Sequence, residues 1–407
     1  MRFPDRPRRV AVTGLGVLAP GAVGVEAFWE ALLRPAAPEV VRRVGEVDLS
    51  RWMPRRDARR LDRFAQLAVA AAGQALADAG YDDSRPVAES GIDPWRVATV
   101  VGTGLGTAEA FEEAVRGLDA RGPRGVPVLT APKAMPGAAS AAVSMTFGLC
   151  GPNEPLVTAC AAGAHSIAHA ARLVALGACD LALAGGAEAC LTDTYLAAFR
   201  GMGALTRTGV ARPFDVARDG FAAGEGAAVL VLEPLEAALA RGARVHLEVL
   251  GAGSTSDAHH LTAPRPDGAG AVAAMRLALA DAGLAPPDVA QVNAHGTSTP
   301  LNDVTEARAI AEVLGAHRPA VTSVKGVTGH TLGAAGAVEA VAVALSVRHR
   351  LVPPTAGLVD VDPAVLETGV DVVRGEPRPW EPGPVLSNSF GFGGHNAALV
   401  LGPPPGS

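Results

Sequence analysis

Short apolar runs alternate with longer alanine-rich stretches through most of this chain. In its first part, residues 9–13, 98–102 and 181–185 have the pattern of buried β-strands, and residues 63–79 and the stretch after Cys160 have that of helices. A second series of such stretches follows at residues 245–250, 270–282, 289–294, 321–324, 333–348, 385–389 and 396–401. This alternation predicts an α/β fold built from two halves of unequal length.

One internal similarity indicates that the two halves are related. Residues 156–176 and residues 322–347 each have the pattern of a strand, a polar turn and a helix of small residues. Coincidence between two alanine-rich helices would give the same pattern, so duplication is one of two interpretations. No low-complexity linker separates the halves, which predicts one compact unit.

The N-terminal region superficially resembles a secretory signal, because basic residues 1–9 precede an apolar stretch at residues 10–20. Gly14, Gly16 and Pro20 interrupt that stretch, which favours a first β-strand that ends in a turn. No run approaches about 18 uninterrupted apolar residues, so we expect no membrane span.

Composition restricts the class of protein further. The chain has 407 residues, of which 49% are hydrophobic and 19% charged, as in globular proteins, and its net charge of −6 argues against a protein that coats nucleic acid. The cysteines show neither CxxC nor Cys/His metal spacing, so we expect no disulfide framework and no metal site; they are Cys150, Cys160, Cys179 and Cys190. A reducing cytoplasm fits this usage.

Cys160 is the first candidate for chemistry. An apolar run leads to this cysteine, which stands where an alanine-rich helix is expected to begin. Backbone N–H groups at a helix start carry partial positive charge and lower a thiol's pKa, as a nucleophile requires. A buried core cysteine is the alternative interpretation, because free cysteine is among the most buried residue types.

Three further turns carry polar groups. His295 lies within residues 293–300 and His330 within residues 325–333, each in a glycine-containing turn that we expect at the end of a strand. A single histidine in such a place is usually structural, but two beside a helix-capping cysteine indicate a site. The glycine-rich residues 387–396 are expected to form a loop whose N–H groups can serve as oxyanion donors.

Together these turns resemble the β-ketoacyl-acyl carrier protein synthases, the elongating ketosynthases of fatty acid and type II polyketide synthesis. The resemblance spans nearly the whole chain and includes residues 12–16, 102–106, 212–215, 218–221 and 224–226. It implies the thiolase fold, a five-layered αβαβα structure of two duplicated halves that usually dimerises. We place the nucleophile in a half formed by residues 1–250 and both histidines in a half formed by residues 251–407.

The resemblance also implies a role for each residue. Cys160 would accept the acyl chain, and the N–H groups of Cys160 and Phe392 would form the oxyanion hole. His295 and His330 would donate hydrogen bonds to the malonyl thioester oxygen during decarboxylation. Lys325 and Glu339 would support the second histidine. No metal or redox cofactor is required, since phosphopantetheine arrives on the acyl carrier protein.

Substrate contacts are also implied. Leu105 and Phe390 would line the acyl pocket, and Phe392 would gate it. The family often has Ser or Thr at the position of Ala162, and residues 323–327 differ from the sequence that is usual in the family. These differences leave the identity of the acyl chain open. A carrier-protein docking surface is expected on one face of a helix, at Arg55, Arg56, Arg59 and Arg60. A solvated surface helix is the alternative.

Other functions fit the residues less well. A degradative thiolase needs a second cysteine near its C-terminus, and this chain has none after Cys190. A non-catalytic chain-length partner subunit typically lacks the nucleophile, and a dinucleotide-binding dehydrogenase needs a further glycine after residues 102–106. The sequence leaves two choices open: fatty acid synthesis or a specialised polyketide or polyene pathway, and a homodimer or a heterodimer.

Overall fold

The computed structural model describes residues 7–84, 86–106 and 108–406 of the chain. Within this part an 11-stranded sheet links two sets of strands, one from each half. The first set runs in the order β4 (Val97–Gly102), β5 (Leu181–Glu188), β7 (Gly226–Pro234) and β1 (Val10–Ala19). β1 confirms the strand expected in the apolar N-terminal stretch. β7 was not expected from the sequence, although all nine of its residues are buried.

The second set repeats this arrangement in the C-terminal half. Its order is β10 (Ala320–Thr322), β9 (Gln291–Asn293), β14 (Val385–Gly391), β15 (His395–Gly402) and β8 (Leu247–Ser256), with β12 (Asp371–Val372) beyond β10. β1 and β8 pair antiparallel over three residues, beginning with Val10 opposite Val249, and this short contact joins the two sets. The division expected after residue 250 falls inside β8, and the segment at 241–246 is the connection between the sets.

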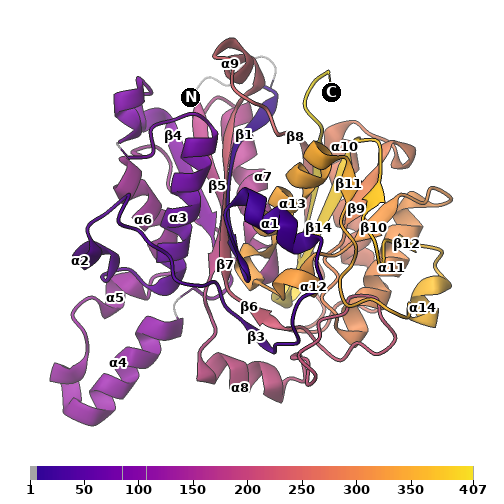
Figure 1. The fold of residues 1–407 in the computed structure, drawn as a ribbon, viewed down its shortest axis with the longest axis horizontal. Helices are drawn as coiled ribbons and strands as arrows, with labels where there is room; N and C mark the ends of the chain where they lie inside the picture. The colour runs from indigo at the N-terminus through magenta and orange to yellow at the C-terminus, as the bar shows by residue number, and fades with distance from the viewer. Residues whose placement is uncertain (1–6, 85, 107, 407) are drawn as a thin grey trace.

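Helices cover both outer faces and also fill the space between the two sets of strands (Figure 1). α3 (Arg63–Asp78) and α6 (Ala138–Phe147) lie on the outer face of the N-terminal set, and α10 (Ala269–Ala282) and α11 (Pro300–Leu314) lie outside the C-terminal set. α7 (Ala162–Ala175) and α13 (Ala335–His349) form the central layer. The five-layered αβαβα arrangement expected from the resemblance is therefore confirmed.

The two central helices approach each other closely because each carries a glycine at the contact. A Cβ atom on Gly163 would lie 2.8 Å from the backbone nitrogen of Ala337, and one on Gly336 would lie 2.7 Å from that of Ala164. The contact is thus reciprocal, as in a structure with internal two-fold symmetry. The stretch Leu332–His349 is apolar and long enough to cross a membrane, but 89% of it is buried inside the protein. Its hydrophobicity is accounted for by this central position.

The starts of the central helices support duplication. A 3₁₀ turn precedes each helix, Ala159–Ala161 before α7 and Leu332–Ala334 before α13. The first residue of each turn has a positive φ, 49° at Ala159 and 47° at Leu332. Non-glycine residues rarely adopt this conformation, so its recurrence at matching places is specific.

The strand expected before Cys160 is absent, which corrects that part of the prediction. Residues 151–156 instead run beside β4 without forming a regular strand, with hydrogen bonds from Thr99 N–H to Pro152 O (2.8 Å) and from Thr103 N–H to Leu156 O (3.1 Å). Pro152 and Pro155 lack the N–H groups that a strand requires, which explains the irregular edge.

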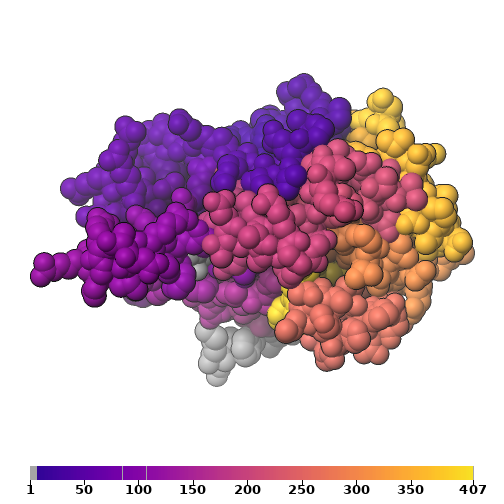
Figure 2. Space-filling model, turned by 90° about the horizontal axis from the view of Figure 1, so that it is seen from below, coloured from indigo at the N-terminus to yellow at the C-terminus, as the bar shows by residue number. Residues whose placement is uncertain are grey.

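Smaller elements complete the described chain. Short strands pair as β1 with β2 (Ala22–Val23), β3 (Val41–Arg42) with β6 (Ala223–Gly224), and β11 (Leu351–Val352) with β13 (Arg378–Pro379). The remaining α-helices are α1 (Val25–Leu32), α2 (Arg55–Ala58), α4 (Ala108–Arg121), α5 (Thr130–Lys133), α8 (Asp193–Gly201), α9 (Leu235–Ala240), α12 (Lys325–Thr328) and α14 (Pro363–Leu366). α4 extends away from the body of the molecule (Figures 1 and 2).

Candidate active site

Cys160 lies in the middle of the 3₁₀ turn that leads into α7, and it is only 6% exposed. The turn between β14 and β15 packs directly against it. A Cβ atom on Gly391 would lie 3.0 Å from the backbone nitrogen of Cys160, so a larger residue there would be crowded against the turn that carries Cys160. The backbone N–H groups of Cys160 and Phe392 are both directed at the thiol. These are the two groups expected to form the oxyanion hole.

The electrostatic state of Cys160 differs from the expectation of a lowered pKa. Burial raises the pKa of the Cys160 thiol to about 11, while the charge of Lys325 and the N–H of Phe392 act in the opposite direction. Desolvation of the thiolate outweighs the helix-start dipole because Cys160 is almost fully buried. The resting group is therefore a thiol, and acylation must include removal of its proton.

His295 and His330 face each other from different segments of the C-terminal half. Their rings lie 5.3 Å apart between centroids at an interplanar angle of 82°. His295 follows β9, as expected, whereas His330 does not stand at a strand end. The one-turn helix α12 and Gly329 separate His330 from β10. Phe221 packs edge-on against His330 and Phe390 against His295, which holds both rings.

Hydrogen bonds fix the same tautomer in both rings. The backbone N–H of Leu332 donates to Nδ1 of His330 at 3.3 Å, and Nζ of Lys325 lies 3.3 Å from Nδ1 of His295. Each Nδ1 is therefore an acceptor, which leaves the proton on Nε2. Burial lowers the pKa of both rings well below the ordinary histidine value, and the charge of Lys325 lowers it further. The site thus holds two neutral Nε2–H donors.

Lys325 and Glu339 form a buried pair beside these rings. Nζ of Lys325 donates to the carbonyl oxygen of His295 at 2.6 Å and also contacts Oε1 of Glu339. Burial raises the pKa of Glu339 to about 7, while Lys325 acts to lower it. The pair was expected to support the second histidine. Its direct contact is instead with the first, His295, and it affects His330 through charge.

A cavity of about 330 Å³ is lined by the three residues expected to act in the reaction, Cys160, His295 and His330. Its walls come from the segment after α8, with Met202 and Ala204, and from the start of α11, with Leu301 and Thr305. Figure 2 shows the face on which the rose-coloured segment containing α8 lies beside the orange C-terminal half. Phe390 lines the cavity, as expected, and so does the gate candidate Phe392. Leu105 belongs to the adjoining apolar cluster, which also contains Cys160.

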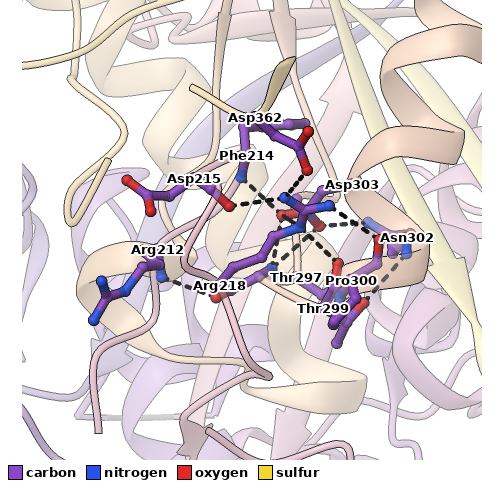
Figure 3. A network of polar contacts seen from close by, with 12 residues as sticks. Arg212, Phe214, Asp215, Arg218, Thr297, Thr299, Pro300, Asn302, Asp303 and Asp362 are labelled. Atoms are coloured by element: carbon purple, nitrogen blue, oxygen red, sulfur yellow. Dashed lines mark hydrogen bonds and ion pairs between the residues drawn. The ribbon is translucent and has the colours of Figure 1, made fainter. Parts of the chain in front are cut away.

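A buried polar network supports the wall of the cavity next to His295 (Figure 3). The guanidinium of Arg218 donates to the carbonyl oxygens of Thr299 (3.1 Å) and Pro300 (3.0 Å) and to the carboxylate of Asp362 (2.6 Å). Thr299 caps α11 and bonds to Thr297 at 2.9 Å, and both threonines line the cavity. Residues 218–221 contributed to the family resemblance, but the sequence did not show that Arg218 would reach this wall.

A second feature that the sequence did not reveal is the carboxylate of Glu188. It is fully buried and accepts hydrogen bonds from the backbone N–H groups of Gly104 (2.7 Å), Gly106 (2.7 Å) and Gly333 (3.2 Å). It therefore ties the loop after β4, which carries Leu105, to the turn before α13. No motif distinguishes a glutamate of this kind, because most of its partners are backbone groups from distant segments.

The arginines proposed for docking are exposed, but they do not share one helical face. α2 contains only four residues, and the chain turns at Leu61 and Asp62 before α3 begins. Arg55 and Arg56 lie in the helix, while Arg59 and Arg60 follow it. The expected helix over 55–63 is thus wrong, although the four side chains remain a basic surface segment. Among the described residues, no cluster of three or more His, Cys, Asp or Glu side chains is arranged to hold a metal ion.

Comparison with known proteins places this site in a family. The family model described as "Beta-ketoacyl synthase, N-terminal domain" matches residues 41–238. The model described as "Beta-ketoacyl synthase, C-terminal domain" matches residues 246–359. The chain belongs to the β-ketoacyl synthase family. A 3-oxoacyl-acyl-carrier-protein synthase 2 from Staphylococcus aureus is 40% identical to this β-ketoacyl synthase over 97% of the chain and 98% of its own length.

Solved structures of related proteins have the same fold. The ishigamide ketosynthase/chain length factor aligns with a TM-score of 0.89 and 36% identity, covering 98% of this chain and 99% of that one. A ketosynthase bound to a hexaketide, in complex with its type II acyl-carrier protein, aligns with a TM-score of 0.86 and 29% identity, covering 98% and 99%. The duplicated fold of this β-ketoacyl synthase is therefore shown over almost its whole length.

Proposed function

We propose that this β-ketoacyl synthase catalyses the decarboxylative Claisen condensation of an acyl chain held on Cys160 with malonyl-acyl carrier protein. One observation carries the proposal. A single cavity brings together a thiol, two N–H groups directed at it and two neutral Nε2–H donors. Condensation needs each of these groups, since it requires a covalent acyl carrier and stabilisation of two oxyanions.

In the first step Sγ of Cys160 attacks the carbonyl carbon of the incoming acyl thioester. The thiol proton is transferred to the sulfur of the departing phosphopantetheine, and the C–S bond to that sulfur breaks. The N–H groups of Cys160 and Phe392 hold the negative oxygen of the tetrahedral intermediate. The acyl chain is then bound to Cys160 as a thioester.

In the second step the malonyl thioester loses CO₂, and the electrons of the broken C–C bond form an enolate. Nε2–H groups of His295 and His330 donate to the enolate oxygen. Neutral donors suit this task, because they stabilise the developing charge without placing a formal positive charge on either buried ring. The enolate carbon attacks the acyl–Cys160 carbonyl, the C–S bond breaks, and Cys160 regains a proton. The scheme uses no metal or redox cofactor.

The related proteins guide the remaining assignments. An acyl carrier protein delivers the substrates, a second ketosynthase or related subunit completes a dimer, and the reaction makes the enzyme an acyltransferase. We propose the cytoplasm as its location, since the chain has four free cysteines. Retention of Cys160 distinguishes the chain from a non-catalytic chain-length subunit. The named relatives are a 3-oxoacyl-acyl-carrier-protein synthase and a type II polyketide ketosynthase, and the proposal covers both fatty acid and polyketide chain extension.

The test separates the two partial reactions. Cys160→Ala is expected to abolish condensation and to leave malonyl-carrier decarboxylation measurable, because both histidines remain. The assay follows CO₂ release and the mass of the carrier-bound product with the wild-type enzyme and with Cys179→Ala as a control for a buried cysteine away from the cavity. Condensation by Cys160→Ala at the wild-type rate would remove Cys160 from the mechanism.

A further inference from the structure

Arg42 is a buried arginine that bonds to backbone carbonyl oxygens, and the nearby charge of Glu39 only partly offsets the effect of its burial. Its side chain is on β3 and the residue is 4% exposed, yet it forms no ion pair with any residue that the structure describes. Instead, Nη1 donates to the carbonyl oxygens of Gly326 (2.8 Å) and Val327 (2.7 Å). Burial lowers the pKa of Arg42. Burying a guanidinium costs free energy unless its N–H groups are hydrogen-bonded, and here the two carbonyl oxygens accept those bonds.

The two carbonyls belong to α12, which begins at Lys325 and ends two residues before His330. This helix has only one turn, and its earlier carbonyls are used by Thr328 N–H, which donates to Val324 O (3.1 Å), and Gly329 N–H, which donates to Lys325 O (3.0 Å). The carbonyls of Gly326 and Val327 are the ones that a helix end leaves without intrahelical partners. A cationic side chain at a helix C-terminus satisfies such groups and favours the local dipole.

The strand that carries Arg42 also holds the other end of this segment. β3 pairs with β6, and Ala223 of β6 also forms an isolated parallel β-bridge with His330. His330 N–H donates to Ala222 O at 2.7 Å, and Gly224 N–H donates to His330 O at 3.0 Å. Arg42 therefore fixes the middle of the segment through α12, while β6 fixes its end. Lys325 at the start of α12 and His330 beyond it are held at a set separation.

We propose that Arg42 is a positioning residue for the decarboxylation step, acting by capping α12 and thereby fixing Lys325 and His330 relative to each other. The inference rests on the proposed function. Arg42 touches none of the reacting groups, so its contribution is geometric. A displacement of about 1 Å in such a segment is enough to reduce a rate by about 10²-fold. The acylation of Cys160 depends on the β14–β15 turn and should be affected much less.

The experiment measures the partial reactions separately in the full-length enzyme. Arg42→Met is expected to lower the kcat of malonyl-carrier decarboxylation by about 10- to 100-fold, with little change in KM and with self-acylation of Cys160 within about threefold of wild type. Arg42→Lys keeps a cation that can reach a carbonyl, and it should recover a substantial part of the decarboxylation rate. This rescue decides the question even if Arg42→Met folds poorly.

A control removes an arginine of another kind, one that is exposed and paired with a carboxylate. Arg241 pairs with Glu233 and bonds to Ala79, far from α12. Arg241→Met should lower the unfolding temperature and leave the ratio of the two partial reactions unchanged. Equal losses of decarboxylation and self-acylation in Arg42→Met, or no loss of either, would overturn the role of Arg42. Absence of condensation in the wild-type enzyme would instead count against the proposed function.

Discussion

Nζ of Lys325 lies 2.6 Å from the carbonyl oxygen of His295 and 3.3 Å from Nδ1 of the same residue. This one ammonium group therefore fixes the backbone and the tautomer of His295 together. Its charge also lowers the pKa of His295, His330 and Cys160, although burial is the larger influence on each. Lys325 thus connects the two parts of the site, the thiol that carries the acyl chain and the donors that stabilise the enolate.

Replacement of Lys325 should make Cys160 less reactive. In Lys325→Met the favourable charge near the thiolate is lost, so the pKa of Cys160 rises further above about 11 and less thiolate is present at any lower pH. Alkylation of Cys160 by iodoacetamide at pH 8–9 should slow, as measured by peptide mass spectrometry over time. Labelling of the exposed Cys150 in the same sample serves as the internal control. Faster alkylation in the variant would show that Lys325 does not favour the thiolate.

The Lys325–Glu339 pair should show strong coupling in its effect on stability. Removal of either partner leaves the other charge buried and unpaired, which costs about 3–5 kcal/mol for a buried pair. Replacement of both by apolar side chains, Lys325→Met with Glu339→Leu, removes the uncompensated charge and should cost less than the sum of the single changes. Denaturant unfolding of the four proteins measures this difference. Additive single and double effects would mean that the two groups do not form an ion pair.

The histidines should remain functional at pH values where an ordinary histidine is protonated. Burial lowers the pKa of both rings well below the usual value of about 6.5, so both stay neutral as the pH falls through that value. Decarboxylation by Cys160→Ala should therefore show no decrease centred on pH 6.5 and should fall only at lower pH, when the rings take up protons. Carrier-protein integrity at each pH is checked by circular dichroism. Glu339, whose pKa is about 7, titrates in the same range, so the test is repeated with Glu339→Gln; a titration at the ordinary histidine value that persists in that variant would contradict neutral donors.

Each histidine should matter more for decarboxylation than for acyl transfer to Cys160. Loss of one preorganised oxyanion donor typically lowers a rate by about 10²–10³-fold, and His295→Ala or His330→Ala should reduce CO₂ release by that order. Self-acylation of Cys160, followed by intact-protein mass spectrometry, should survive better, because the N–H groups of Cys160 and Phe392 serve that step. The reverse order of sensitivity would mean that the two roles have been exchanged.

The sequence predicted the parts of this site that lie on regular local patterns. Cys160 was recognisable because small residues follow it at helical spacing, and His295 because an apolar strand leads to a glycine turn. The layered fold followed from the same alternation together with the family resemblance. Arg42, Glu188 and Arg218 could not be found in this way. Each of them bonds to a backbone group of a distant segment, Arg42 to Gly326, Glu188 to Gly104 and Arg218 to Thr299, and such hydrogen bonds follow no periodic pattern in a sequence.

Three local features of the molecule differ from those predicted from the sequence, each for a physical reason. The thiol of Cys160 was expected to be acidified by the helix start, but burial has the larger effect and raises its pKa. The strand expected at the start of residues 156–176 does not form, because the preceding segment contains Pro152 and Pro155. The strand expected at residues 385–389 is confirmed as part of β14, but it continues to Gly391 into the expected loop, because these residues pair with β15 and only Phe392–Gly394 form the turn. Glycines in that stretch allow close approach to Cys160 and do not make it a loop.

The basic segment at Arg55, Arg56, Arg59 and Arg60 gives the last prediction, which concerns the carrier protein. The four side chains are exposed, whereas the neighbouring Arg63 is directed inward and bonds to Glu225 at 2.9 Å. A docking role requires such exposure, because complementary charge acts mainly on encounter and is screened by salt. Reversal of the four exposed arginines to Glu should raise the KM for carrier-bound substrate about tenfold at low salt, with the difference shrinking as salt is added.

A matched reversal elsewhere makes this test specific to position. Four other exposed arginines, Arg34, Arg276, Arg308 and Arg318, provide the same change in net charge away from the basic segment. That control should alter the KM for the carrier-bound substrate much less, and neither variant should change the kinetics with a small acyl thioester that lacks the carrier. If both reversals raise the KM equally, the effect comes from overall charge. If the small thioester is affected as strongly as the carrier-bound one, the segment acts on the site itself and is not a docking surface.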